Sequence, residues 1–292
     1  MNKLQSIKKP IVFTTTLLLA AVLAGCGGSS GGGTAAAGPA AAGSTCTATT
    51  GCVDLKSAAN YAILAQTGVT YTPTATATST PKIIGNIGLS PAAASFITGF
   101  ALNLPAGGAY STSTLVNGAV YAPGYANPTP NDLTVAVGDQ NAAYLAASNM
   151  ATSGGGLTVA ACPGASGAIS DVNDTTAGFP STGLPAGVYT CSVNLSIPGN
   201  LTLNGSATDV WVIKTTGTLS QTAATQVLLT GGALPQNVFW QVAGVVSIGS
   251  SAQMQGVIMS ASDINLITSA TVKGRLYSKT TVAMDNNTVT QP

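Results

Sequence analysis

The chain has 292 residues, of which 45% are hydrophobic and 6% are charged, with a formal net charge of +1, no His and no Glu. These counts argue against acid–base or His-activated catalysis and, because Arg275 is the single arginine, against a basic surface for nucleic acid. The apolar content still predicts a large buried core, under a surface built from Thr, Ser, Asn, Gln, Ala and Gly.

Residues 1–25 are expected to be a targeting signal. Three lysines within the first nine residues precede the apolar run "IVFTTTLLLAAVLAG", which ends at Cys26 in "LAGC". This pattern resembles a bacterial lipoprotein signal, which implies cleavage before Cys26 and lipidation of its thiol. With Gly27 next, it also implies sorting to the outer membrane or cell surface. The alternative is an ordinary secretory signal and a secreted protein; the run is short for a membrane span.

Residues 26–52 are expected to be a tether that holds the folded domain away from the membrane. After Cys26, residues 27–45 are "GGSSGGGTAAAGPAAAGST", a low-complexity run without the hydrophobic periodicity that would form a buried face. In an exported chain, the four further cysteines are candidates for disulfides with three connectivities. We favour Cys46 with Cys52 and Cys162 with Cys191. Neither a C-x-x-C spacing nor a His is present to complete a zinc site.

Residues 53–292 have an even composition and are expected to form one domain. A helix is predicted at about 130–151, with Asn131 as its N-cap and Asp132 in its first turn. Residues 100–129, rich in Pro, Gly and Tyr, are expected to be an irregular loop or cap region. The apolar positions that recur at helical spacing are Leu133, Val137, Ala143, Tyr144 and Ala147.

After about residue 185 the sequence repeats a short strand-like phrase. "VFWQVAG" at 238–244 is followed by "VIMSASD" at 257–263 and "RLYSKTT" at 275–281, with periods of 19 and then 18 residues; "WVIKTTG" at 211–217 precedes them. In this alignment the shared corner positions are Gly217, Gly244, Asp263 and Thr281.

A second and often a third β-prone run follows each corner, as in "VVSIG" and "AQMQG". Strand, corner, strand, corner, strand at a nearly fixed period predicts a mainly β, three-sided solenoid. A β-sandwich is the alternative, because it also has turns at short intervals, but it does not require aligned corner residues.

The repeats and several spaced motifs resemble the microbial ice-binding (antifreeze) family, whose members have an irregular β-solenoid. "AILAQTG" overlays "RLYSKTT", which suggests that the first strand stacks beside the last coils. The motifs, which span the domain in order, are "AILAQTG" at 62–68, "GNIGLSP" at 85–91, "LPAGVYTCSVNLSI" at 184–197, "LTGGALPQNVFWQVAG" at 229–244 and "VKGRLYSKTTVAMDNNTVT" at 272–290.

The resemblance implies a solenoid of triangular cross-section, a long helix packed along one side and a cap region inserted before that helix. It also implies that the protein binds ice through one flat face, slows ice growth and recrystallisation, and uses no cofactor, metal or small-molecule substrate. The sequence departs from the family where Lys214 stands in place of a common Gln, and where Ser stands in place of Ala in two of the repeats.

The ice-binding face is predicted from the alternation of side chains along each strand. If Trp240 and Val242 point inward, Gln241 and Ala243 point outward, as expected of a face built from small uncharged side chains. The alternative is the reversed parity, which would turn Trp240, Tyr277 and Lys279 outward and make the face bulky and charged. The predicted outward set is Ala65, Thr67, Lys214, Thr216, Gln241, Ala243, Ser260, Ser262, Ser278 and Thr280. The inward set is Leu64, Gln66, Ile213, Thr215, Trp240, Val242, Met259, Ala261, Tyr277 and Lys279.

Two other functions are considered. A polysaccharide lyase or hydrolase needs clustered acidic groups, whereas Asp209, Asp263 and Asp285 here sit at predicted turns, where Asp is common for structural reasons. A surface adhesin or structural module without ice activity would also suit a tether and a repetitive face. The predicted partners are therefore ice or ordered water, with the membrane reached through the lipid anchor alone.

Overall fold

The computed structural model describes residues 53–73, 80–150, 158–161, 167–170 and 182–292, all within the compact unit Gly38–Pro292. The predicted signal and tether, with Cys26, Cys46, Cys52 and Cys162, lie outside the described residues.

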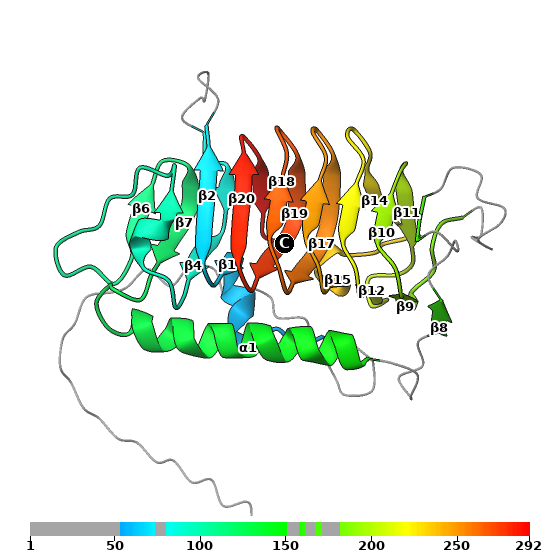
Figure 1. Ribbon diagram of the computed structural model, residues 1–292, viewed down its shortest axis with the longest axis horizontal. Helices are drawn as coiled ribbons and strands as arrows, with labels where there is room; N and C mark the ends of the chain where they lie inside the picture. Colours follow the sequence, from blue (N-terminus) through cyan, green and yellow to red (C-terminus); the bar gives the residue numbers. More distant parts are fainter. Residues whose placement is uncertain (1–52, 74–79, 151–157, 162–166, 171–181) are drawn as a thin grey trace, which may run out of the picture. The chain divides into compact units, whose positions relative to one another are not determined.

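The described chain is mainly β, with one long helix running beside a stack of strands (Figure 1). The strands are β1 (Tyr61–Ala65), β2 (Gly68–Thr72), β3 (Ile83–Ile84), β4 (Asn86–Leu89), β5 (Ile97–Thr98), β6 (Ser111–Ser113), β7 (Val116–Tyr121), β8 (Thr158–Ala161), β9 (Gly187–Cys191), β10 (Leu195–Ile197), β11 (Leu201–Asn204), β12 (Trp211–Thr215), β13 (Leu219–Gln221), β14 (Val227–Thr230), β15 (Val238–Val242), β16 (Val246–Ile248), β17 (Gln253–Ser260), β18 (Ile264–Leu266), β19 (Thr271–Ser278), β20 (Thr281–Asp285) and β21 (Thr288–Thr290). The helices are α1 (Thr129–Asn149) and the short 3-10 segments η1 (Lys56–Asn60), η2 (Ala94–Phe96) and η3 (Pro235–Asn237).

The strands form three faces around one core, and the prediction of a three-sided solenoid is confirmed. The helix-covered face consists of β9, β12, β15, the C-terminal halves of β17 and β19, β1 and β4. The open face is the sheet with the order β10-β13-β16-β18-β20-β2-β5. The third face consists of β11, β14, the N-terminal halves of β17 and β19, β21 and β3.

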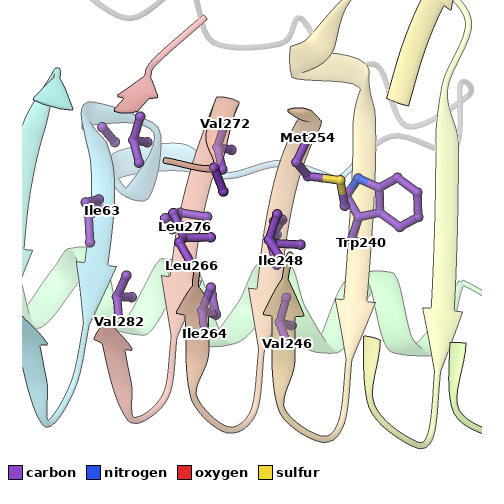
Figure 2. Packing of buried hydrophobic residues seen from close by; sticks show 14 of the residues in the cluster. Ile63, Trp240, Val246, Ile248, Met254, Ile264, Leu266, Val272, Leu276 and Val282 are labelled. Carbon is purple, nitrogen blue, oxygen red and sulfur yellow. The ribbon is translucent and has the colours of Figure 1, made fainter. Parts of the chain in front are cut away.

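Each face sends alternate side chains into a shared interior (Figure 2). Trp240 enters from the helix-covered face, Ile248 from the open face and Val272 from the third face. The indole Nε1 of Trp240 donates a hydrogen bond to the carbonyl of Gln255 at 2.8 Å, so its polar atom is satisfied. Burial of these branched and aromatic side chains is the main force that holds successive coils together.

The corner between the third face and the helix-covered face is called the far corner here, and it depends on glycine. β17 and β19 pass through it without a break at Gly256 and Gly274, which are register partners. A Cβ on Gly274 would lie 1.8 Å from the carbonyl oxygen of Gly256, and one on Gly256, at φ +109°, would lie 2.6 Å from that of Val238. Any larger residue would push the coils apart.

Helix α1 packs on the outer side of the helix-covered face. Its buried side chains, which include Leu133, Ala143 and Tyr144, join an apolar cluster with Phe239 and Tyr277 of the sheet. The predicted helix and its apolar positions agree with this packing. The prediction of Asn131 as N-cap is wrong, because the helix begins after Pro128 and has no side-chain cap. A proline in its first turn supplies the helical φ instead.

The first strands stack beside the last coils, as the overlay of "AILAQTG" on "RLYSKTT" predicted. β1 pairs in parallel with β19, and β2 pairs in parallel with β20. Residues 100–129, expected to be irregular, contain the antiparallel pair β6 and β7, and β7 also continues the stack beyond β3 and β4. In the described part of the chain, no helix combines the length and apolarity needed to cross a membrane.

Candidate functional site

The repeats are in a register that differs by one residue from the predicted alignment. β15 pairs with β17 so that Phe239 lies beside Val257 and Trp240 beside Ile258, an offset of 18 residues rather than 19. The offsets from β12 to β15 and from β17 to β19 are as predicted. Since a slip of one residue exchanges the two sides of a strand, predicted directions are inverted in β1, β17 and β19.

Trp240 and Val242 point inward as predicted, and so do Ile213 and Thr215, whereas the inverted strands do not follow the prediction. Residues expected inside lie on the helix side instead: Leu64, Met259 and Tyr277 in the apolar cluster, Gln66 with its amide 3.4 Å from Asn141 of α1, Ala261 packed against the cluster and Lys279 with its Nζ 4.2 Å from the ring centroid of Tyr144.

Lys214 and Gln241 point away from the interior, but α1 covers them and both are buried, so the prediction that they face solvent is wrong. The Nζ of Lys214 donates to the carbonyls of Ser148 and Met150, at 2.9 and 3.3 Å, where α1 ends. A cation at this position complements the negative end of the helix dipole and the free carbonyls there. Burial lowers the pKa of Lys214 below its ordinary value.

Ser260 and Ser278 are also buried, and the prediction that they face solvent is wrong for a different reason. Each hydroxyl donates to a carbonyl of the preceding coil, Gly244 for Ser260 and Ser262 for Ser278, at 2.8 Å in both cases. Each also accepts the backbone N–H two residues later, at 3.0 and 2.9 Å. Thr215 makes the equivalent pair of contacts, since its hydroxyl donates to the carbonyl of Val193 in the preceding coil and accepts the backbone N–H of Gly217. These hydroxyls close the corner between two faces.

Of the other predicted outward residues, Ala65 lies in the interior cluster, so that prediction too is wrong. The remaining five are exposed or half-buried, and they lie at the corner where the helix-covered face turns into the open face. The corner positions of successive coils are bonded through their backbones, as in Gly244 to Gly217 and Thr67 to Thr280. The five corner residues are Thr67, Thr216, Ala243, Ser262 and Thr280.

The predicted set missed the outer side of the open face. The strands β10, β13, β16, β18, β20 and β2 each bury two residues and turn the one between them outward, which is the alternation expected of a half-exposed strand. These outward positions are register partners from one end of the sheet to the other. They form the central rank: Ser196, Ser220, Ser247, Asn265, Ala283, Thr70 and Thr98.

The central rank is small, uncharged and regularly spaced. Parallel strands lie about 4.8 Å apart, so the rank repeats at that distance along the solenoid. Within the described residues, the side-chain hydroxyls of Ser220, Ser247 and Thr70 have no protein partner and are available to water. The sequence signal for this face is the alternation of apolar and polar residues in "VSI" at 246–248 and "INL" at 264–266, which is shorter than the repeats that predicted the solenoid.

Acidic groups border the open face at its edges rather than in the central rank. The Oδ1 of Asp263 accepts from the backbone N–H of Thr281 at 3.2 Å and from the hydroxyl of Thr280 at 2.5 Å. The hydroxyl of Thr281 lies 3.0 Å from that of Thr67 in the neighbouring strand. This series of contacts joins three coils along the corner and fixes the positions of its hydroxyls.

The third face is less regular. β11 and β14 form a sheet of their own, and β14 meets β17 through a single bridge at Gln226 and Gln253. Its outer side also carries the exposed cation Lys273 and the large apolar side chain of Leu228, 37% exposed. Of the three faces, the open face therefore offers the most continuous uncharged surface.

Cys191 is buried and disulfide-bonded, and its partner lies outside the described residues, so the pairing with Cys162 stays a prediction. Over the described ranges, His, Cys, Asp and Glu form no group of three or more that would hold a metal ion.

Comparison with known proteins identifies this architecture. A sequence profile of the ice-binding-like family matches residues 63–290, which is nearly all of the solenoid. The chain belongs to the ice-binding family. The resemblance drawn from the repeats and the spaced motifs is thereby confirmed, and so is the fold that it implied.

Ice-binding relatives come from both fungi and bacteria. The chain is 39% identical to Ice-binding protein K1-A of Typhula ishikariensis over 208 residues, which are 71% of the chain and 76% of the relative. It is 34% identical to an ice-binding protein of Flavobacterium frigoris over 252 residues, 86% of the chain and 80% of the relative. The solved structure of an ice-binding protein from an Arctic yeast, described for its antifreeze activity, matches with a TM-score of 0.73 at 34% identity, covering 83% of this chain and 95% of that one.

Proposed function

We propose that the protein binds ice through the open face and thereby inhibits ice growth and recrystallisation. The observation that carries this proposal is the central rank, in which small uncharged side chains occupy register positions across the whole sheet. The family membership supports ice as the ligand, because the relatives are ice-binding proteins.

The chemistry of the central rank suits ordered water. Hydroxyl and amide groups anchor water molecules by hydrogen bonds, while the methyl groups of Thr70 and Ala283 leave nearby water bonded to other water. A charged side chain would impose its own hydration shell, and the central rank has none. Because the backbone of a continuous sheet fixes the spacing of the rank, little side-chain freedom is lost when ice binds.

We include the corner residues at the border of this surface. Thr67 and Thr280 lie next to the open face, and their hydroxyls are held by Thr281 and Asp263. The proposal also keeps the predicted lipid anchor at Cys26 and the tether 26–52, which would place the domain at the cell envelope. A surface adhesin without ice activity is the alternative that the experiment below addresses.

The experiment compares ice affinity of the purified protein with that of two tyrosine variants. Ser247→Tyr adds a bulky ring at the centre of the open face, and Thr271→Tyr adds the same ring at an exposed position of the third face. We expect Ser247→Tyr to lower the protein recovered in a growing ice fraction by about tenfold and to abolish ice shaping, with Thr271→Tyr unchanged. Equal ice recovery for both variants would overturn the choice of face.

Exclusion of the unmodified protein from ice would overturn the function itself and favour the adhesin without ice activity. Thr67→Tyr then tests the corner: a loss smaller than that of Ser247→Tyr places Thr67 at the border of the contact, whereas a larger loss moves the contact to the corner.

A further inference from the structure

The open face contains one joint between strands that are remote in the sequence. β20 and β2 lie side by side (Figure 1), with Ala283 beside Thr70 in the central rank. Thr281 of β20 and Thr67, which directly precedes β2, are 214 positions apart in the chain. Elsewhere in this sheet, each strand follows its neighbour one coil later in the sequence. We call the joint between β20 and β2 the seam; non-covalent contacts must keep the central rank in register across it.

Asp263 lies one coil before the seam, at a position that recurs in every coil of the open face. This position directly precedes the first inward residue of each strand, and it lies two residues before the central rank. Because side chains alternate along a strand, it is on the same outer side of the sheet as the central rank. The register partners at this position, which we call the border rank, are Asn194, Thr218, Val245, Asp263, Thr281 and Gly68.

One carboxylate oxygen of Asp263 holds the C-terminal side of the seam. Its Oδ1 accepts from the hydroxyl of Thr280 at 2.5 Å and from the backbone N–H of Thr281 at 3.2 Å. Across the seam, the carbonyl of Thr280 accepts the backbone N–H groups of Gln66 and Thr67, at 3.2 and 3.0 Å. The hydroxyl of Thr281 lies 3.0 Å from that of Thr67. Asp263 therefore holds both of the residues through which this corner meets the coil of β2.

A second residue of the border rank makes the same kind of contact without a charge. The Oδ1 of Asn194 accepts the backbone N–H of Thr218 in the next coil at 3.0 Å, just as the Oδ1 of Asp263 accepts the N–H of Thr281. An amide oxygen and a carboxylate oxygen are both acceptors, and the two side chains have the same length. The contact therefore depends on an acceptor oxygen at this position, which an asparagine at 263 would also supply.

From these contacts we infer that Asp263 is a positioning residue for ice binding, which keeps the two parts of the central rank in line across the seam. The inference rests on the proposed function of the open face. A shift of Thr70 relative to Ala283 would divide the central rank into two shorter ranks, and ice would then have to pay the cost of realigning them when it binds. Asp263 acts through Thr280 and Thr281 and need not touch ice itself.

The experiment measures ice recovery and the free energy of unfolding for the purified protein and three variants. Asp263→Ala removes the acceptor oxygen, and we expect it to lower the protein recovered in a growing ice fraction about threefold. Asp263→Asn keeps the acceptor oxygen and should restore recovery to that of the unmodified protein. Asp209→Ala is the matched control, because the Oδ2 of Asp209 accepts the backbone N–H of Ser206 at 2.7 Å at the far corner. It loses a similar contact away from the open face and should leave ice recovery unchanged.

Equal ice recovery for Asp263→Ala and the unmodified protein would overturn the inference while the proposed function stands. A loss in Asp263→Asn as large as that in Asp263→Ala would also overturn it, because the charge and not the acceptor would then matter. An equal loss in Asp209→Ala would show that ice recovery merely follows stability, and would overturn it too. Exclusion of the unmodified protein from ice would overturn the proposed function, and the inference with it.

A second pair of variants tests the seam even if Asp263→Ala does not fold. Thr281→Val and Thr67→Val each remove one partner of the hydroxyl contact and keep a branched side chain. We expect each to lower ice recovery about twofold, and the double variant to lower it no further than either alone, because both changes remove the same contact. Losses that multiply in the double variant would overturn the inference, since each hydroxyl would then act on ice independently.

Discussion

The helix-covered face and the open face are adjacent sides of the same coils, yet most of their outward side chains differ in size and polarity. Val212, Phe239, Met259 and Tyr277 project from the first and are buried under α1. Small polar residues such as Ser247 project from the second and meet solvent. Both faces are parallel sheets, so backbone geometry does not distinguish them. The size and polarity of the outward residue decide which face accepts a helix and which accepts water.

The largest expected effect comes from removing a large outward side chain on the helix-covered face. Phe239→Ala should lower the free energy of unfolding by about 3–5 kcal/mol, because it leaves a cavity between β15 and α1. Urea denaturation followed by circular dichroism measures the change. On the open face, Ser247→Ala is the matched control and should stay within about 0.5 kcal/mol. Similar losses for both variants would contradict the contrast between the two faces.

A smaller effect is expected at the corner that joins the two faces. Ser278→Ala removes the partner of the Ser262 carbonyl and of the Thr280 N–H, which should lower the free energy of unfolding by about 1–3 kcal/mol. Val242 occupies the equivalent register position two coils away and shows that one coil manages without this hydroxyl. We therefore expect that Val242→Ser does not raise the free energy of unfolding. A clear rise would show that every coil requires a hydroxyl at this corner.

The smallest effect concerns the one lysine that was predicted to contact ice. Lys214→Met removes the cation that holds the last carbonyls of α1, and should lower the free energy of unfolding by about 1–2 kcal/mol. Ice shaping should be unchanged, since the open face is not altered. Lys273→Met on the third face is the matched control and should leave stability unchanged. Loss of ice shaping in Lys214→Met at unchanged stability would return Lys214 to the ice contact.

The sequence allowed the solenoid, the helix and the stacking of β1 on β19 to be predicted, because repeats and helical periodicity are local signals. It did not allow the register between β15 and β17 to be predicted, since "VFWQVAG" and "VIMSASD" match almost as well at 18 as at 19 residues. Parity alone also could not show which face α1 covers. The large apolar residues Phe239 and Tyr277 point outward and are buried under α1, so their size and apolarity mark the face that the helix covers.

β21, β1 and β2 together form one coil, with β21 on the third face, β1 on the helix-covered face and β2 on the open face. This arrangement affects how the protein unfolds. In most stacked repeat proteins the chain ends are also the ends of the stack, so terminal coils fray first. Here both ends of the described chain lie inside the stack, and internal segments such as β7 form its outermost layers. Opening the chain at its ends would require neighbouring coils on both sides to separate, so unfolding should begin at loops between coils rather than at the termini.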